Sequence, residues 1–375
     1  MEKTKTEPKN LYSGYDVGLL FPVLFLVGVG IVMIYSASYA LAFNKFGSGY
    51  FFLKKQAFFA LIGIITLVLC RHFPYRFFRH LAYPLIALAL GLLVAVLFSE
   101  YGHSAGGATR WLRVGAISFQ PSEFARFALI VYMAHSLHKK QEHIRRFSIG
   151  FLPHVLVLAP FCILILVQPD FGSAIILGAI TWILLFVGGV RFTHLSSALV
   201  AILPVAYWLL INAKYRLRRL LSFLDPWQYP ADEGYQIVHS LMAFGTGGIW
   251  GTGIGKGYQK LFYLPEPHTD FIFSVIGEEL GLLGVMLIIG LYFLILWRGI
   301  NIARNADDPF GTFLAFGLTI ALGLQVIVNM GVTLGLLPTK GLTLPFLSYG
   351  GTSLLLNMAS IGILMNIRAL HAKRA

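Results

Sequence analysis

Charge is what this chain has least of. Only 12% of its 375 residues are charged and 57% are hydrophobic, with a mean hydropathy of +0.75. Soluble domains are about 45–50% apolar and about 25% charged, so this composition excludes them and indicates an integral membrane protein. Residues 1–16 are polar, and the apolar segment that follows is too long for a signal peptide and lacks a small-residue cleavage site. We expect that segment to remain as a membrane span.

Cysteine and metal-binding clusters are also scarce. Cys70 and Cys162 are the only cysteines, and both lie within apolar segments, which excludes a disulfide framework. The eleven histidines are scattered. His135 and His138 share a helical face, but no third ligand is near them in the sequence. We predict no resident metal site.

Two further classes are excluded by their missing motifs. The net charge of +13 could suggest nucleic acid, yet no basic stretch is interleaved with aromatics in a soluble segment. In a membrane protein such residues gather at the interfaces. The passage GTGGIWGTGIGKG at 245–257 matches neither the dinucleotide-binding nor the P-loop pattern, and we expect its glycines to allow tight turns near the membrane.

Long apolar runs are abundant. We count ten that approach the ~20 residues needed to cross a bilayer. They predict an all-α protein with ten transmembrane helices in a single polytopic domain, residues 1–375. The predicted helices are 17–37, 56–71, 81–98, 123–137, 151–167, 172–190, 194–212, 271–297, 312–334 and 345–367.

Basic residues set the predicted orientation. With the N-terminus inside, inner segments hold 16 of the 29 Lys and Arg, and outer segments hold 13. Long loops weigh little in orientation, and without the 213–270 loop the ratio is 16 to 7. We therefore expect both termini inside, with cytoplasmic tails at 1–16 and 368–375. The loop 213–270, between helices seven and eight, becomes a large structured extracytoplasmic segment.

The outer face collects cations that topology alone would remove. They lie in the predicted loops 99–122 and 213–270, and a phosphate-bearing lipid would account for them, because Arg and Lys bind phosphate well. The alternative is contact with ordinary anionic headgroups. The outer cations are Arg110, Arg113, Lys214, Arg216, Arg218, Arg219, Lys256 and Lys260.

One carboxylate is placed at the end of the long loop. In LPEPHTDFIF, Asp270 stands where the loop becomes an apolar helix, and ionisable groups at a membrane wall are candidates for function. A simple helix cap is the alternative. Asp270, Ser274 and Glu278 recur at i, i+4 and i+8, which predicts a polar-lined cleft entering the bundle from outside. Glu279 adds a second acid that needs a cavity or a cation.

Glu123 and Arg126 form a second charged pair. Their i, i+3 spacing places them on one face at the outer end of the fourth predicted helix. The alternative is that the two charges only neutralise each other at the helix N-terminus, since Pro121 and Glu123 both suit a first turn. No Ser-His-Asp or Cys-His arrangement is evident. Carboxylates beside cations suit removing a proton from a hydroxyl while stabilising an anionic phosphate leaving group.

Five motifs carry a resemblance to a known family. They are ATRWLRVGAISFQPSEFAR, QPDFGSA, FLDPWQYP…GYQIVHS, KLFYLPEPHTDFIFSVIGEELGLLG and LPTKGLTLPFLSYGGTSLL. The chain resembles, over nearly its whole length, the SEDS family of membrane-embedded peptidoglycan glycosyltransferases. PTKGLTLPFLSYGG and YLPEPHTDFIF are more similar to its division branch, FtsW, than to its elongation branch, RodA. A sporulation-type relative is a further alternative.

The resemblance implies an activity and its residues. It implies polymerisation of lipid II on the outer face of the cytoplasmic membrane, with loss of undecaprenyl pyrophosphate and formation of a β-1,4 linkage. Asp270 matches the family's essential Asp and is its implied general base. The resemblance implies that Arg110, Trp111, Glu123 and Arg126 lie around the same cavity, with the segment Ser348–Ser353 near it. We expect substrate binding by these four residues, by Ser348 and Gly350, and also by Lys256, His268 and Glu278.

Other implications concern partners and cofactors. Relatives commonly have Lys where this chain has Arg126, so a planar fork replaces a compact ammonium. The family works with a class B penicillin-binding transpeptidase (FtsI-like) and other division membrane proteins. No cofactor is bound covalently, and a divalent cation, Mg2+ or Mn2+, would rest on substrate pyrophosphate oxygens.

Two other function classes fit parts of the pattern. A lipid II flippase would also use a ten-helix bundle with intramembrane acids, but its cavity must open to both sides, whereas the polar excess here is one-sided. A docking scaffold would leave the outer cations and carboxylates unexplained. The pKa of Asp270 is a further question, because a helix N-terminus lowers it and burial raises it.

Overall fold

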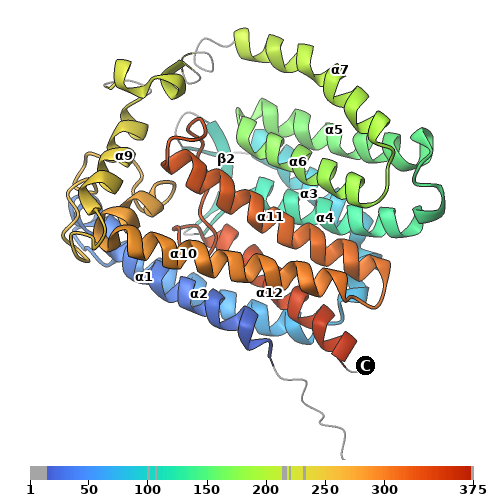
Figure 1. Cartoon of the computed structure of the whole chain (residues 1–375), viewed down its shortest axis with the longest axis horizontal. Helices are drawn as coiled ribbons and strands as arrows, with labels where there is room; N and C mark the ends of the chain where they lie inside the picture. Colours follow the sequence, from blue (N-terminus) through green and yellow to red (C-terminus); the bar gives the residue numbers. More distant parts are fainter. Residues whose placement is uncertain are drawn as a thin grey trace, which may run out of the picture.

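The chain forms an elongated helical bundle (Figure 1). The computed structural model describes residues 15–98, 102–105, 108–115, 117–212, 218, 221–230 and 234–372. Short 3₁₀ or π turns at Tyr75–Phe77, Gln141–His143, Phe147–Phe151 and Pro226–Gln228 join some of the helices. The helices are α1 Val17–Phe46, α2 Phe51–His72, α3 Phe78–Phe98, α4 Pro121–Lys139, α5 Leu152–Val167, α6 Phe171–Val187, α7 Phe192–Ile211, α9 Tyr235–Gly247, α10 Ile272–Arg304, α11 Pro309–Thr333 and α12 Gly351–Ala372.

Each of the ten predicted segments coincides with a helix, but several predicted ends are wrong. α1 runs nine residues past its predicted end at 37, and α2 begins at Phe51 rather than 56. α12 begins at Gly351 rather than 345, because Phe346 has φ +68°, a left-handed conformation that interrupts a helix. α12 ends at Ala372, so 368–372 belong to the helix rather than to a tail.

The prediction of an all-α protein is wrong between α3 and α4. Three short strands, β1 Gly102–Ala105, β2 Ala108–Val114 and β3 Ile117–Phe119, form an antiparallel sheet in the order β1-β2-β3. His103 pairs with Trp111, and Leu112 pairs with Phe119. The β-branched and aromatic residues of ATRWLRV favour a strand, and Gly115 supplies the positive φ of the turn that follows.

Seven helical segments of the described residues are long and apolar enough to cross a membrane. They contain α1, α2, α3, α5, α10, α11 and α12. α6 and the apolar part of α7 are shorter. α4 carries charges but is almost wholly buried among other helices, so protein rather than lipid surrounds it. A helix in that position does not need an apolar surface.

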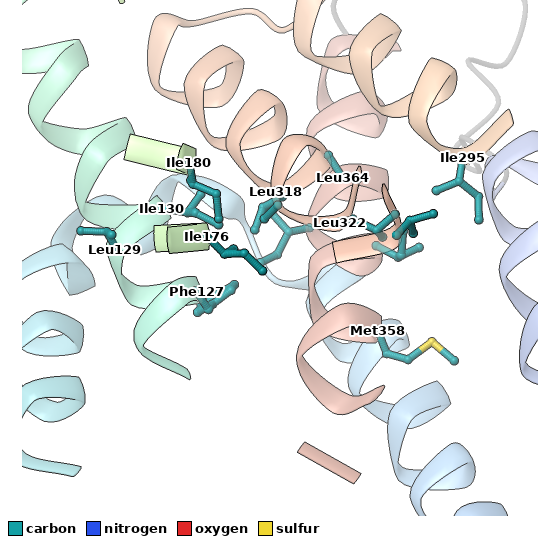
Figure 2. Packing of buried hydrophobic residues seen from close by; sticks show 14 of the residues in the cluster. Phe127, Leu129, Ile130, Ile176, Ile180, Ile295, Leu318, Leu322, Met358 and Leu364 are labelled. Atoms are coloured by element: carbon teal, nitrogen blue, oxygen red, sulfur yellow. The ribbon is translucent and has the colours of Figure 1, made fainter. Parts of the chain in front are cut away.

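A continuous apolar core holds the bundle together (Figure 2). α4 packs between α3 and α11, and α12 packs along α2. Ile130 of α4, Ile180 of α6 and Leu318 of α11 are each at most 3% exposed. α7 lies apart in Figure 1 and packs only lightly on α6.

α10 is broken at Gly281, whose φ and ψ are 65° and −166°. The glycine-rich passage supplies the hydrogen bonds that the break removes. The N–H groups of Thr252 and Gly253 donate to the carbonyls of Glu278 and Glu279 at 2.9 and 3.0 Å. Across the break, Leu282 N–H donates to Gly248 O at 2.9 Å. The glycines of 245–257 therefore allow backbone to lie against backbone beside the broken helix.

The two ends of the bundle are distinct. Arg368 in the last turns of α12 pairs with Asp16 at the start of α1, so the first and last helices meet at this end of the bundle. At the same end, Tyr75 N–H donates to Asn366 Oδ1 at 2.9 Å, and Arg79 pairs with Asp308 at 3.1 Å. α12 runs from Gly351 toward this end, so the segments around 268–270 and 340–350 lie at the opposite end.

Candidate functional site

Asp270 is the second residue before α10, and a neighbouring loop holds its backbone. Ser348 Oγ donates to Thr269 O at 2.5 Å and accepts from Leu344 N–H at 2.7 Å. Tyr349 N–H donates to His268 O at 2.9 Å. The HTD segment at 268–270 is therefore joined by hydrogen bonds to the SYGG segment at 348–351.

Two amides on α11 complete this support. Asn329 Nδ2 donates to Asp270 O at 2.9 Å and to Leu342 O at 2.6 Å. Gln325, one turn earlier on the same face, donates to Thr343 O at 2.9 Å and to Ser353 Oγ at 3.3 Å. Each buried amide thus binds loop groups that would otherwise be unsatisfied in the bundle. Neither amide was predicted from sequence, although polar side chains four residues apart in an apolar span are a signal for function.

The Asp270 carboxylate is half-buried and faces Gly341. Its Oδ2 is 3.0 Å from the position that a Cβ would take on Gly341, so only glycine fits beside it without displacement. Burial and the Glu266 charge raise the pKa of Asp270 to about 7, against the lowering effect of Arg110. Among the described residues, no hydrogen-bond donor caps the carboxylate. Asp270 is therefore poised to accept a proton near neutral pH, and the helix-cap alternative has no hydrogen bond to support it.

His268 lies close to Asp270 in the chain and packs against aromatic rings. Its ring is 4% exposed and lies against Phe52 and Tyr349, with ring centroids 4.5 and 5.7 Å away. Burial lowers the pKa of His268 and so favours the neutral ring. Its Nδ1 is buried and has no hydrogen-bond partner within the described part of the chain.

Arg110 joins the β-sheet to the turn between α5 and α6. Its Nη2 donates to Pro169 O at 2.6 Å, and its Nε is 3.9 Å from Asp170 Oδ2. Asp170 also caps α6 through Ser173 N–H at 3.2 Å. Lys340 approaches the same place, because its Cδ is 3.2 Å from the position that a Cβ would take on Gly172. Burial lowers the pKa of Lys340 and the charge of Asp170 opposes this.

Asp170 and Lys340 were not among the predicted site residues. Both belong to motifs that carry the family resemblance, QPDFGSA and LPTKG, but they are far apart in the chain. Only the fold places them together with Arg110. The resulting group holds two cations and one carboxylate, and Arg110 also acts electrostatically on Asp270.

Glu123 and Arg126 pair on α4, as their spacing predicts. They are 6% and 7% exposed. The start of α4 is fixed to α12, since Gln120 N–H donates to Thr352 Oγ1 at 3.2 Å. Gly350 lies beside this junction and accepts from Leu354 N–H at 2.9 Å at the start of α12. Trp111 lies in β2 and is partly exposed.

The predicted cleft along one face of α10 is wrong. Ser274 and Glu278 are fully buried. Ser274 Oγ binds Ser240 Oγ of α9 at 2.6 Å, and Glu278 accepts N–H bonds from Tyr258 at 2.7 Å and Gln259 at 3.2 Å. Glu278 therefore anchors the loop, because a buried carboxylate must be satisfied and backbone N–H groups were available.

The predicted cations of the long loop differ in their exposure. Lys256 is exposed on the glycine-rich passage, and Lys260 is buried against Glu279. Lys214, Arg216 and Arg219 lie outside the described residues. The described residues include no cluster of three or more His, Cys, Asp or Glu that could hold a metal ion.

Fold and site together define a class of protein. It is a polytopic helical membrane protein with a carboxylate of raised pKa at one end of its bundle, beside two cationic groups on neighbouring loops. Comparison with known proteins gives the family. The cell cycle protein family of FtsW, RodA and SpoVE matches residues 18–373, and the chain belongs to this family.

Individual relatives are similar over nearly their whole length. A probable peptidoglycan glycosyltransferase FtsW of Trichlorobacter lovleyi is 48% identical, and the match covers 95% of this chain and 93% of the relative. Stage V sporulation protein E of Bacillus subtilis is 40% identical, with 98% of each chain covered. A solved chain of a peptidoglycan synthase complex that coordinates polymerization and crosslinking has a TM-score of 0.79 at 32% identity. That match covers 97% of this chain and 99% of the solved chain.

Proposed function

We propose that this protein is a peptidoglycan glycosyltransferase that polymerises lipid II into β-1,4-linked glycan for septal wall synthesis. The observation that carries the proposal is Asp270, a half-buried carboxylate whose pKa is raised to about 7 and which no donor caps among the described residues. The FtsW relatives support the activity and the division role.

The residues divide the chemistry between them. Asp270 accepts the proton from the 4-hydroxyl of the acceptor sugar as that oxygen bonds to the anomeric carbon of the donor. The bond from that carbon to undecaprenyl pyrophosphate breaks, and the electron pair leaves with the pyrophosphate. Arg110 and Lys340 offset the negative charge that develops there. Lys340 suits this role because burial increases the strength of its interaction with an anion.

The other predicted substrate-binding residues lie where they can bind substrate or support the loops of the site. Arg126 pairs with Glu123, so its charge is shared before any substrate binds. Trp111 offers a partly exposed ring on the sheet for stacking against a sugar. Ser348 and His268 hold the loop that carries Asp270, and Gly350 accepts a hydrogen bond at the start of α12. Lys256 is exposed and free to meet phosphate.

We infer ten spans in the cytoplasmic membrane, with both termini inside and the site outside. Seven helical segments of the described residues qualify by length and hydropathy, and α4, α6 and α7 complete the set. The Asp16–Arg368 pair supports an even number, because it brings the start of α1 and the last turns of α12 to the same end of the bundle. The ratio of basic residues supports the inside location.

The partner is a class B penicillin-binding transpeptidase among other division membrane proteins. The similarity to a chain of a complex that coordinates polymerization and crosslinking supports this. We propose that Mg2+ or Mn2+ is held chiefly by substrate pyrophosphate oxygens, because the described residues supply no cage of three ligands. Nucleic acid is not among the proposed partners.

Polymerisation in detergent separates this function from a lipid II flippase, since flipping has no meaning without a bilayer. Purified protein, lipid II and the transpeptidase partner are mixed, and glycan strands are resolved on gels. Wild type should form strands. Asp270→Asn should lose at least about 100-fold in rate, the lower range for a general base. Asp307→Asn, an exposed acid at the opposite end, should retain full rate. Full activity of Asp270→Asn would refute the assignment of Asp270.

A further inference from the structure

Ser36, Lys260 and Glu279 form a buried ionic cluster that joins three elements. Lys260 pairs with Glu279, and Lys260 Nζ also donates to Ser36 Oγ at 2.7 Å. Ser36 Oγ lies 2.7 and 2.8 Å from the two Glu279 oxygens. The three residues are 9%, 8% and 1% exposed. They come from α1, the long loop and α10, so the cluster is formed only by the tertiary fold.

Glu279 belongs to the first segment of α10, and Asp270 lies two residues before the start of that segment. The break at Gly281 separates a short segment, 272–280, from the rest of the helix. Glu279 stands next to the break, and Asp270 lies just beyond the other end of the segment. Gly255 N–H adds a bond to Glu279 Oε2 at 3.0 Å. Because the segment is too short to be held by its own hydrogen bonds, its direction depends on anchors from other elements. The backbone of Thr252 and Gly253 supplies some of these anchors, and the buried cluster supplies a side-chain anchor.

The Ser36 end belongs to a long element of the bundle. α1 packs against α10, and the loop residues 254–261 cover it. A cavity of about 370 Å³ adjoins the cluster, lined by Val32, Tyr35, Tyr39 and Ile254 as well as by Ser36 and Lys260. At this junction the ionic cluster links α1 directly to the loop through the Lys260–Ser36 hydrogen bond.

We propose that Ser36, Lys260 and Glu279 are positioning residues, which hold the 272–280 segment so that Asp270 meets the acceptor hydroxyl. A buried ion pair contributes little net stability, because desolvation offsets its attraction. It does specify one geometry, since either charge left alone is strongly unfavourable. A displacement of about 1 Å at a catalytic group costs roughly 100-fold in rate. The cluster thus affects catalysis by fixing the orientation of the 272–280 segment and, with it, the position of Asp270.

This inference rests on the proposed function, and its test contains a readout that does not. Ser36→Ala removes the link from α1. Ser38→Ala is the matched control, because Ser38 is fully buried on the same helix and its Oγ has no hydrogen-bond partner among the described residues. Lys260→Met and Glu279→Gln are made singly and together. Each protein is assayed for polymerisation with its partner, for thermal unfolding, and for hydrogen exchange over 268–280.

Ser36→Ala and Lys260→Met should lower kcat at least about tenfold with KM within about twofold of wild type, the split expected when only the transition-state geometry is lost. Hydrogen exchange over 268–280 should increase in both. Ser38→Ala should match wild type. The Lys260→Met/Glu279→Gln double variant should regain the wild-type unfolding temperature without regaining kcat. It leaves no buried charge unpaired, but it does not restore the geometry of the cluster.

Two results would overturn the positioning role. One is an unchanged kcat in Ser36→Ala and Lys260→Met. The other is a double variant that regains kcat together with stability, which would make the cluster purely structural. A wild-type protein that makes no glycan refutes the proposed function instead, and hydrogen exchange over 268–280 still tests the positioning.

Discussion

At the scale of single residues, Asp270 shows how opposed effects set one pKa. The start of α10 and Arg110 favour the charged form, whereas burial and Glu266 favour the neutral form. Burial is the largest effect, and the pKa rises to about 7. The residue is therefore a stronger base than an ordinary aspartate and titrates near neutral pH.

The first prediction concerns the dependence of rate on pH. Since the base must be deprotonated, kcat/KM for polymerisation should rise with pH and level off above an apparent pKa of about 7. Glu266→Gln removes a negative charge that raises the pKa, so its profile should shift to lower pH. Initial rates with purified lipid II between about pH 5 and 9 measure both. A profile that is flat across the lower part of that range would contradict the assignment.

The second prediction concerns stability. The folded pKa of Asp270 lies above the usual value of 3.8, so its protonated form favours the folded state. That contribution is present at low pH and is lost as pH rises from about 4 through 7. Asp270→Asn, which cannot ionise, should therefore have an unfolding temperature equal to or above wild type at about pH 8. The difference should be smaller at about pH 5, and a markedly less stable variant at the higher pH would contradict this account.

At the scale of elements, the broken helix and its glycine-rich partner form one unit. Gly281 adopts a conformation that essentially only glycine allows, and a Cβ there would lie 2.3 Å from Gly251 N. Gly251 in the loop lies equally close to α10, since a Cβ added to it would lie 2.2 Å from Glu279 O. Sequence patterning predicts α10 as one continuous helix because hydrophobic periodicity does not report a single residue's dihedral angles.

The third prediction follows from this geometry. Gly281→Ala should destabilise the fold by about 3 kcal/mol or more, because strain and overlap add. Gly290→Ala is the matched control, since it lies in the same helix and a Cβ added there would meet nothing within 4 Å. It should leave stability unchanged or slightly raised. Thermal unfolding in detergent compares the two, and equal effects would refute the role of the break.

At the scale of the whole molecule, the bundle has a structural end and a chemical end. One end holds the Asp16–Arg368 pair, the Tyr75–Asn366 contact and the Arg79–Asp308 pair. The loops around Asp270, Arg110 and Lys340 lie at the other. α4 crosses between them, buried by its neighbours, which is why a helix with charged residues can cross the bundle.

The fourth prediction tests which end of the bundle faces the outside of the cell. After Cys70 and Cys162 are replaced by alanine, a cysteine at exposed Tyr258 should react with a membrane-impermeant maleimide in intact spheroplasts. A cysteine at Asn305, in the turn between α10 and α11, should react only after the membrane is opened. Labelling followed by gel shift measures both. The reverse pattern would invert the proposed orientation.

The sequence determined what depends on composition and local periodicity. Apolar runs located the helices that correspond to all ten predicted segments, and the i, i+3 spacing of Glu123 and Arg126 predicted their pairing. Motif resemblance indicated the family and singled out Asp270. These features lie within short windows of the chain, where hydrophobic burial and helix geometry act directly.

Only the tertiary structure decided which distant groups meet. It placed Arg110, Asp170 and Lys340 together, bound Asp270 to Asn329 of α11, and turned Glu278 toward backbone N–H groups instead of a cleft. It also formed the Ser36–Lys260–Glu279 cluster from three separate elements. The physical reason is that a buried polar group must be satisfied by whatever the fold brings beside it, and local sequence does not specify that neighbour.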